Sequence, residues 1–301
     1  MSAPHLYDVA PPLARDPDRQ ASVLGLSFGG WHRIAYTDWG PLGDHTPVMC
    51  VPGLSRQGRD FDFLAEELAH HGRRVVCPDL PGRGRSSRLA SAFHYVLPQY
   101  CADLATVTYA TGAQKVDWVG TSLGGLIGIV LAGMPGNRIR RLVVNDIGPS
   151  VSHEAERRIG ERLDQMPERF KTFEDAMAFF RVAFADYGAM DNVRWNHIVR
   201  HSIEWSKRDG AFNLLYDRRI TTAYHLYRYY STSLWTFWRN IRVPILILVG
   251  EKSNVLPPKL VREMQRQNPR ARCLKVPDVG HMPMLMQSDQ VDPVVRFLME
   301  E

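Results

Sequence analysis

Cysteine is scarce in this sequence, with four residues among 301, and none of them has the spacing of a metal-binding motif. Three of the four, Cys50, Cys77 and Cys273, fall in or beside stretches predicted as strands. We therefore expect buried free thiols. The cysteine pattern gives no reason to expect a structural metal centre.

Long apolar runs are also lacking. No stretch approaches the roughly 18 uninterrupted apolar residues of a transmembrane helix, so we expect no membrane span. Residues 1–20 contain four prolines and several charges but no apolar segment of a secretory signal. We expect these residues to form an extended arm, and the absence of a signal favours a cytoplasmic location.

Neither sign of charge dominates. Charged residues make up 23% of the chain, and the formal net charge is +5. The excess comes from scattered arginines such as Arg138, Arg140 and Arg141, and no run interleaves aromatic side chains with basic ones. This distribution predicts a solvated basic surface and no nucleic-acid partner.

What the sequence does contain is enough apolar residues, 45% of the chain, for a large core. An alternating pattern over residues 23–39 predicts an antiparallel hairpin. Short apolar strands then alternate with helical periodicity, which predicts a mostly parallel sheet covered by helices on both faces. The predicted strands span residues 48–51, 74–77, 116–119, 141–145, 244–250 and 272–276.

Residues 151–240 interrupt this alternation. They contain no convincing strand, yet they hold 17 of the 30 aromatic residues. Helices are predicted near residues 173–184, 193–205 and 220–230. Because most aromatic side chains on helices serve packing, we assign at most a third of them to a pocket. The candidates are Trp195, Trp205, Tyr216, Tyr224, Tyr229, Trp235 and Trp238.

The most informative stretch is Gly120-Thr121-Ser122-Leu123-Gly124. It follows a predicted strand and precedes a predicted buried helix, which is the context of a nucleophile elbow. The glycines at 120 and 124 remove side chains that would collide in so sharp a turn. This context predicts that Ser122 is exposed at the N-terminus of a helix, where a developing negative charge is stabilised.

Four motifs occur in a fixed order along the chain: Pro52-Gly53-Leu54, residues 79–86 (Asp-Leu-Pro-Gly-Arg-Gly-Arg-Ser), residues 120–124 and Gly280-His281. In this order, and over residues 22–299, the chain resembles the α/β-hydrolase family. The resemblance implies an α/β fold with a mostly parallel eight-stranded sheet flanked by helices. It also implies a core formed by residues 21–150 and 241–301, with residues 151–240 inserted as a helical cap.

The resemblance assigns roles to individual residues. Ser122 would be the nucleophile, and His281, in the loop after the last strand, would be its general base. The backbone N–H groups of Leu123 and Leu54 would form the oxyanion hole. Members of the family usually have His-Gly at the start of the loop that carries Leu54, whereas this chain has Pro52 there. The backbone N–H of Leu54 can act as a donor without that histidine.

The acid of the triad departs from the family pattern. Asn254 occupies the usual position, where an aspartate is expected. Some hydrolases carry the acid at the end of the strand that follows the elbow helix. In this chain, Asp146 occupies that position. Three explanations stay open: Asp146 is the working acid, Asn254 is an engineered replacement of aspartate, or the enzyme is weak or inactive.

The resemblance implies a serine hydrolase that cleaves carboxylic esters through an acyl-enzyme. Serine at the elbow argues against dehalogenases and epoxide hydrolases, which need a carboxylate nucleophile. The alternatives are a carbon–carbon bond hydrolase of ring-cleavage products, a perhydrolase or haloperoxidase-like activity, and a binding protein of the same fold. The expected partner is a small-molecule ester, with no cofactor and no metal, and the sequence predicts no oligomeric state.

Overall fold

The computed structural model describes residues 15–43, 46–227 and 233–300 of the chain. A sheet of eight strands lies at its centre. These strands are β1 Arg19–Ser27, β2 Gly30–Trp39, β3 Val48–Val51, β4 Val75–Pro78, β5 Val116–Thr121, β6 Ile139–Asn145, β10 Ile245–Gly250 and β11 Ala271–Val276. Their spatial order is β1-β2-β4-β3-β5-β6-β10-β11. β2 pairs antiparallel with β1 and β4, and the remaining neighbours are parallel, as the sequence predicted.

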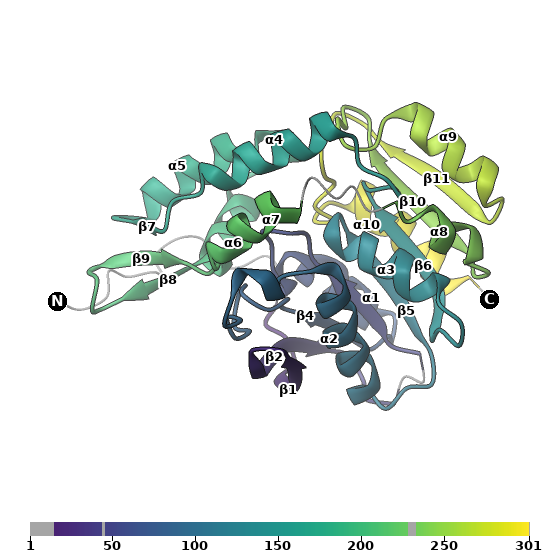
Figure 1. Cartoon of the computed structure of the whole chain (residues 1–301), viewed down its shortest axis with the longest axis horizontal. Helices are drawn as coiled ribbons and strands as arrows, with labels where there is room; N and C mark the ends of the chain where they lie inside the picture. Colours follow the sequence, from purple (N-terminus) through teal and green to yellow (C-terminus); the bar gives the residue numbers. More distant parts are fainter. Residues whose placement is uncertain (1–14, 44–45, 228–232, 301) are drawn as a thin grey trace.

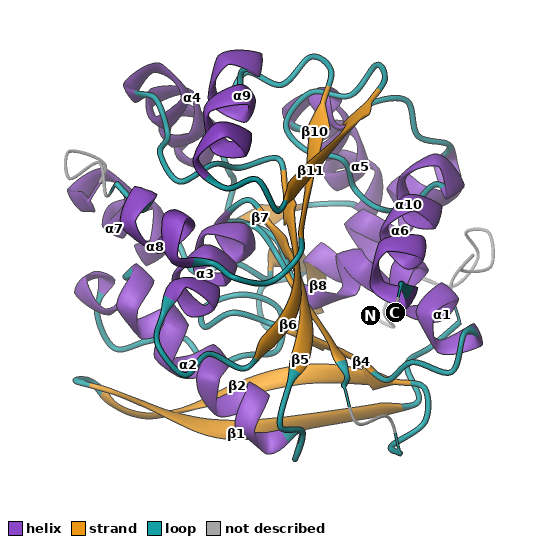
Figure 2. Ribbon diagram, turned by 90° about the vertical axis from the view of Figure 1, so that its right-hand side faces the viewer, coloured by secondary structure: helices purple, strands orange, loops and turns teal. Residues whose placement is uncertain are grey.

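The inner strands are buried on both faces because successive side chains enter two separate cores. In β3, Val48 and Cys50 contribute to one core, whereas Met49 and Val51 contribute to the other. Figure 2 shows helices on both sides of the sheet. α1 (Asp62–His70) and α10 (Ser288–Met299) cover one face. The other face is covered by α2 (Leu97–Ala110), α3 (Leu123–Gly133), α8 (Trp235–Asn240) and α9 (Pro258–Gln267).

Within residues 151–240, named here the cap segment, α4 His153–Asp164, α5 Phe173–Ala183, α6 Asn192–Ser202 and α7 Arg219–Tyr227 form a group of helices with a small sheet (Figure 1). α8 also belongs to this stretch of the sequence, but it lies beside the core sheet, where Trp238 binds the carbonyl of Met264 on α9. The expectation that the segment contains no strand is wrong. β7 (Arg169–Phe170), β9 (Ala211–Leu214) and β8 (Ile203–Ser206) form a three-stranded sheet in that order. Strands of two to four residues are too short to show a periodic pattern. The division into core and cap at residues 150 and 240 stays a prediction.

Two further expectations need correction. Residues 1–14 of the expected arm lie outside the described residues, and β1 begins at Arg19, before the expected end of the arm. Cys50, Cys77 and Cys101 are buried thiols, whereas Cys273 is exposed. The reason is that β11 is an edge strand that buries only its two end residues. Within the described residues, no helix is long and apolar enough to span a membrane.

The turn between β5 and α3 depends on close backbone contacts. A Cβ atom on Gly120 would lie 2.2 Å from the carbonyl oxygen of Gly124, and one on Gly124 would lie 2.1 Å from that of Val51. Both distances are shorter than any van der Waals contact. The two glycines therefore let the start of α3 pack directly against β5 and the end of β3.

We predict that Gly124→Ala lowers the free energy of unfolding by about 1–3 kcal/mol or more, because the added methyl group has no space next to the Val51 carbonyl. Urea denaturation of the purified variant measures this change. Gly43→Ala is the matched control, since a Cβ at Gly43 meets no atom within 4 Å. Equal stability of the two variants would contradict the close approach.

Candidate active site

Ser122 lies between β5 and α3 with a backbone φ of 50°, in the left-handed region that a side chain rarely adopts. Its backbone N–H donates to the carbonyl oxygen of Asn145 at 2.9 Å, which ties the turn to the end of β6. The side chain is therefore presented at the carboxyl end of the sheet and at the first turn of α3. This is the geometry of a nucleophile elbow.

The imidazole of His281 connects two other side chains. Its Nε2 lies 3.2 Å from the hydroxyl oxygen of Ser122, and its Nδ1 lies 2.7 Å from Oδ2 of Asp146. His281 is 8% exposed. With a proton on Nδ1 donated to Asp146, Nε2 is left to accept the hydroxyl proton of Ser122.

Asp146 is fully buried in the turn after β6. Both carboxylate oxygens have donors besides His281: Oδ1 accepts from the backbone N–H of Gly250 at 3.1 Å, and Oδ2 accepts from the hydroxyl of Ser253 at 2.8 Å. The backbone N–H of Asp146 itself donates to Leu248 at 2.8 Å. These contacts offset the free-energy cost of burying a carboxylate.

Asn254 lies in the turn after β10, and its side chain is exposed. Among the described residues, the ring of His281 is hydrogen-bonded to Asp146 and Ser122 rather than to Asn254. β6 and β10 are adjacent parallel strands, so the turns that follow them lie side by side at one edge of the sheet. The structure thus brings together Ser122, His281 and Asp146, and leaves Asn254 apart from them.

The loop after β3 packs against the serine. A Cβ on Gly53 would lie 3.5 Å from the Cβ of Ser122, and Leu54 and Leu123 both line the cavity at this point. Arg83 fixes the loop, because its Nε donates to the carbonyl oxygen of Leu54 at 2.7 Å. The motif of residues 79–86 contains Arg83, but nothing in the sequence indicates this contact with Leu54.

Arg83 is itself held rigidly. It is 1% exposed, and its Nη1 donates to the hydroxyl of Tyr100 at 2.7 Å and to the carbonyl of Pro81 at 2.6 Å. The side chain packs over the ring of Tyr100, with the guanidinium carbon 5.0 Å from the ring centroid. A buried arginine therefore orients the backbone that carries Leu54.

A cavity of about 540 Å³ opens above Ser122 and His281. Its walls are mostly apolar and come from the core and from the cap segment. The aromatic residues that the cap contributes are Phe184, Tyr187 and Tyr224. Burial raises the pKa of Tyr187, so its hydroxyl stays protonated at neutral pH.

Most of the aromatic residues considered from the sequence do not reach this cavity. Tyr224 lines it, whereas five others do not, and Tyr229 lies outside the described residues. Trp238, for example, is fully buried against α9 and donates to the carbonyl of Met264 at 2.9 Å. Phe184 and Tyr187 were missed because no pattern in the sequence separates pocket aromatics from packing ones.

Comparison with known proteins agrees with this architecture. A sequence model of the alpha/beta hydrolase fold matches residues 46–286. A 3-hydroxybutyrate-oligomer hydrolase of Cupriavidus necator is 38% identical over 288 residues, which cover 93% of this chain and 97% of that protein. The chain belongs to the alpha/beta hydrolase fold family.

Two further proteins are similar to this chain at lower identity or over a shorter stretch. The crystal structure of a putative hydrolase from Rickettsia typhi superimposes with a TM-score of 0.86 at 25% identity, covering 94% of this chain and 99% of that one. A 2-hydroxy-6-oxo-2,4-heptadienoate hydrolase of Pseudomonas putida is 34% identical over 107 residues, or 34% of this chain and 38% of that protein.

If Ser122, His281 and Asp146 form a catalytic triad, the geometry predicts a large effect for a substitution at Asp146 and a small one for a substitution at Asn254. Asp146→Asn should lower kcat for ester hydrolysis by about 10⁴-fold. The amide carries no negative charge to stabilise the imidazolium of His281, and it favours the wrong tautomer of the ring. Asn254→Asp, at the exposed position, should change kcat less than threefold by the same argument. Steady-state kinetics of both variants measures these values. A large gain in Asn254→Asp with a mild loss in Asp146→Asn would show that position 254 holds the acid.

Proposed function

We propose that this protein is a serine hydrolase that cleaves carboxylic esters through an acyl-enzyme on Ser122. The observation that carries the proposal is the continuous pair of contacts from Ser122 through His281 to Asp146, at the floor of an apolar cavity. A nucleophile, a base within hydrogen-bond reach and a carboxylate that orients the base are the three parts that acyl transfer requires.

In the first half of the reaction, Nε2 of His281 takes the hydroxyl proton while the Ser122 oxygen attacks the ester carbonyl. The oxyanion that forms is held by the backbone N–H groups of Leu54 and Leu123. His281 then gives its proton to the leaving alcohol. In the second half, water takes the place of that alcohol and attacks the acyl carbonyl while His281 removes a proton from it. The bond to Ser122 then breaks, His281 returns the proton to the Ser122 oxygen, and the acid is released.

Two observations support short aliphatic hydroxy-acid esters, such as 3-hydroxybutyrate oligomers, as the substrate class. The relative from Cupriavidus necator acts on 3-hydroxybutyrate oligomers and aligns over nearly the whole chain. The cavity has the size for a small oligomer and is lined mainly by apolar groups near Ser122, including Leu126 and Ile147.

A carbon–carbon bond hydrolase would need polar groups to hold a charged dienoate. The arginines of the lining are Arg56 and Arg162, and both already pair with carboxylates within the protein. Arg56 binds Asp60 with two hydrogen bonds, and Arg162 contacts Asp186 at 2.7 Å. The lining therefore favours the ester over the dienoate.

Ser122→Ala should reduce ester turnover by at least 10³-fold, because it removes the nucleophile and almost no packing volume. A fluorophosphonate should label the wild-type protein once per chain, and Ser122→Ala should take up no label. Circular dichroism of the variant checks that the fold is retained. Turnover within tenfold of wild type, or labelling of the variant, would refute the assignment.

A substrate panel tests the specificity. We expect hydrolysis of 3-hydroxybutyrate dimers and trimers and of short p-nitrophenyl esters, with kcat/KM falling as the acyl chain outgrows the cavity. A ring-cleavage dienoate should be turned over at least 100-fold less efficiently. A preference for the dienoate would favour the carbon–carbon hydrolase instead.

A further inference from the structure

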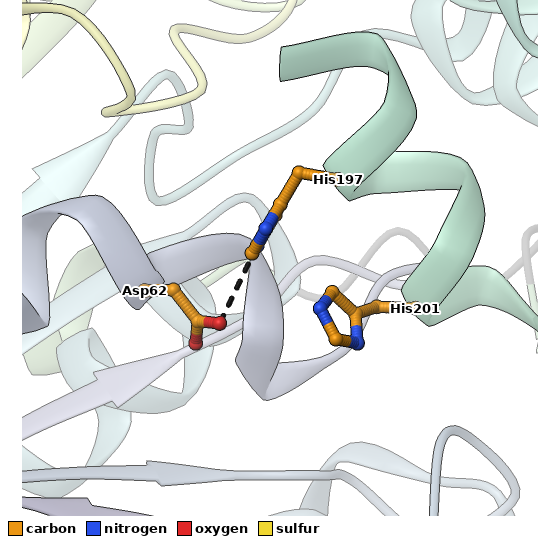
Figure 3. A group of neighbouring side chains, drawn as sticks. All are labelled: Asp62, His197 and His201. Carbon is orange, nitrogen blue, oxygen red and sulfur yellow. Dashed lines mark ion pairs between the residues drawn. The ribbon is translucent and has the colours of Figure 1, made fainter. Parts of the chain in front are cut away.

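A second group of ionisable side chains lies at the contact between the core and the cap segment. It consists of Asp62, the first residue of α1, and of His197 and His201 on α6 (Figure 3). The proposed ester hydrolysis uses none of the three. None of the three belongs to the family motifs in the sequence.

The arrangement of the three side chains is that of a metal site. His197 and His201 are four residues apart on one helix and therefore share a face. Each of the three residues offers a ligand atom within 4.8 Å of those of the other two. The histidine rings contact each other edge to face, with centroids 4.6 Å apart. A similar pair of histidines one helical turn apart holds zinc in several metalloenzymes.

Two buried acceptors in this group have no partner among the described residues. Asp62 is fully buried, and its Oδ1 has no hydrogen bond; His197 is 4% exposed, and its Nδ1 has none. Oδ2 of Asp62 accepts from Nε of Arg59 at 2.6 Å and lies 3.4 Å from Nε2 of His197 (Figure 3). Nε2 of His197 donates to the Arg59 carbonyl oxygen at 2.9 Å, which leaves Nδ1 as the nitrogen with a free lone pair. Buried polar atoms without partners are costly and point to a missing ligand.

The charges around the group act on a bound cation in both directions. Arg59 and Arg200 oppose a bound cation, whereas Asp60 favours it.

We propose that Asp62, His197 and His201 bind one divalent transition-metal ion of the Zn²⁺ type. Two imidazoles and one carboxylate form the ligand set that such ions prefer, with water completing the coordination. Ligand atoms about 2.0–2.2 Å from zinc lie roughly 3.5 Å from one another, whereas those of this group lie within 4.8 Å, so metal binding requires the side chains to rotate toward one another. Arg59 then acts as the outer partner that orients the carboxylate through Oδ2.

Such a site would hold α6 against the core, next to the loop after β3 that carries Leu54. Two contacts already link these parts: the side chain of Gln57 donates to the carbonyl of His201, and Nη1 of Arg56 lies 3.2 Å from the hydroxyl of Ser202. A metal that binds only the folded state raises the unfolding temperature. The proposal does not depend on the ester-hydrolase assignment, because it involves none of the residues of that reaction.

The test uses the full chain, stripped with a chelator and titrated with Co²⁺. We expect one Co²⁺ per chain, visible as d–d absorption bands, and one equivalent of Zn²⁺ retained after gel filtration and measured by elemental analysis. Adding Zn²⁺ should raise the thermal midpoint of the stripped protein. His201→Gln should weaken Co²⁺ binding at least tenfold, and Asp62→Asn should do the same.

The matched control is the double substitution His70→Gln, His71→Gln. These two histidines are exposed beside Glu67, with Nε2 of His71 3.3 Å from Oε1 of Glu67, and should bind no metal tightly. If Asp62→Asn does not fold, His201→Gln decides alone, because His201 is only half-buried. Absence of stoichiometric binding to wild type, unchanged affinity in His201→Gln, or loss of binding in the control would overturn the proposal.

Discussion

The hydrogen bond between Nδ1 of His281 and Asp146 is the interaction on which the proposed chemistry depends. It fixes the ring so that Nε2 faces Ser122, and the carboxylate is the only negative charge that contacts the ring within the described residues. Without it, the serine hydroxyl would have a base of undefined tautomer. The bond is possible only because the interior accepts a fully buried carboxylate.

The order of the strands explains how the buried carboxylate of Asp146 finds hydrogen-bond donors. β6 and β10 are neighbours, so the backbone N–H of Gly250 and the hydroxyl of Ser253, both after β10, reach the carboxylate that follows β6. The turn after β10 thus supplies two hydrogen-bond donors to Asp146, the proposed acid. If Asp146 is the acid, the proposed mechanism needs no carboxylate at position 254.

The sequence predicted the fold, because strand–helix alternation is a local feature. The motifs around Ser122 and His281 are local as well, and the structure brings these two side chains within hydrogen-bond distance, while their catalytic roles stay a prediction. It left the choice between Asp146 and Asn254 open, since the choice depends on which of two neighbouring turns faces the imidazole. The sequence does not indicate the hydrogen bond from Arg83 to the Leu54 carbonyl, because these two residues are 29 positions apart in the chain. The exposure of Cys273 depends on β11 being an edge strand, which a single sequence does not indicate.

The most direct test of the account is a single turnover with a slowly hydrolysed carbamate, p-nitrophenyl dimethylcarbamate. We predict the release of one p-nitrophenol per chain, a carbamoyl group on the peptide that contains Ser122, and a much slower release in Asp146→Asn. Stopped-flow absorbance and peptide mass spectrometry measure these quantities. Release without a label at Ser122, or at the wild-type rate in Asp146→Asn, would contradict the account.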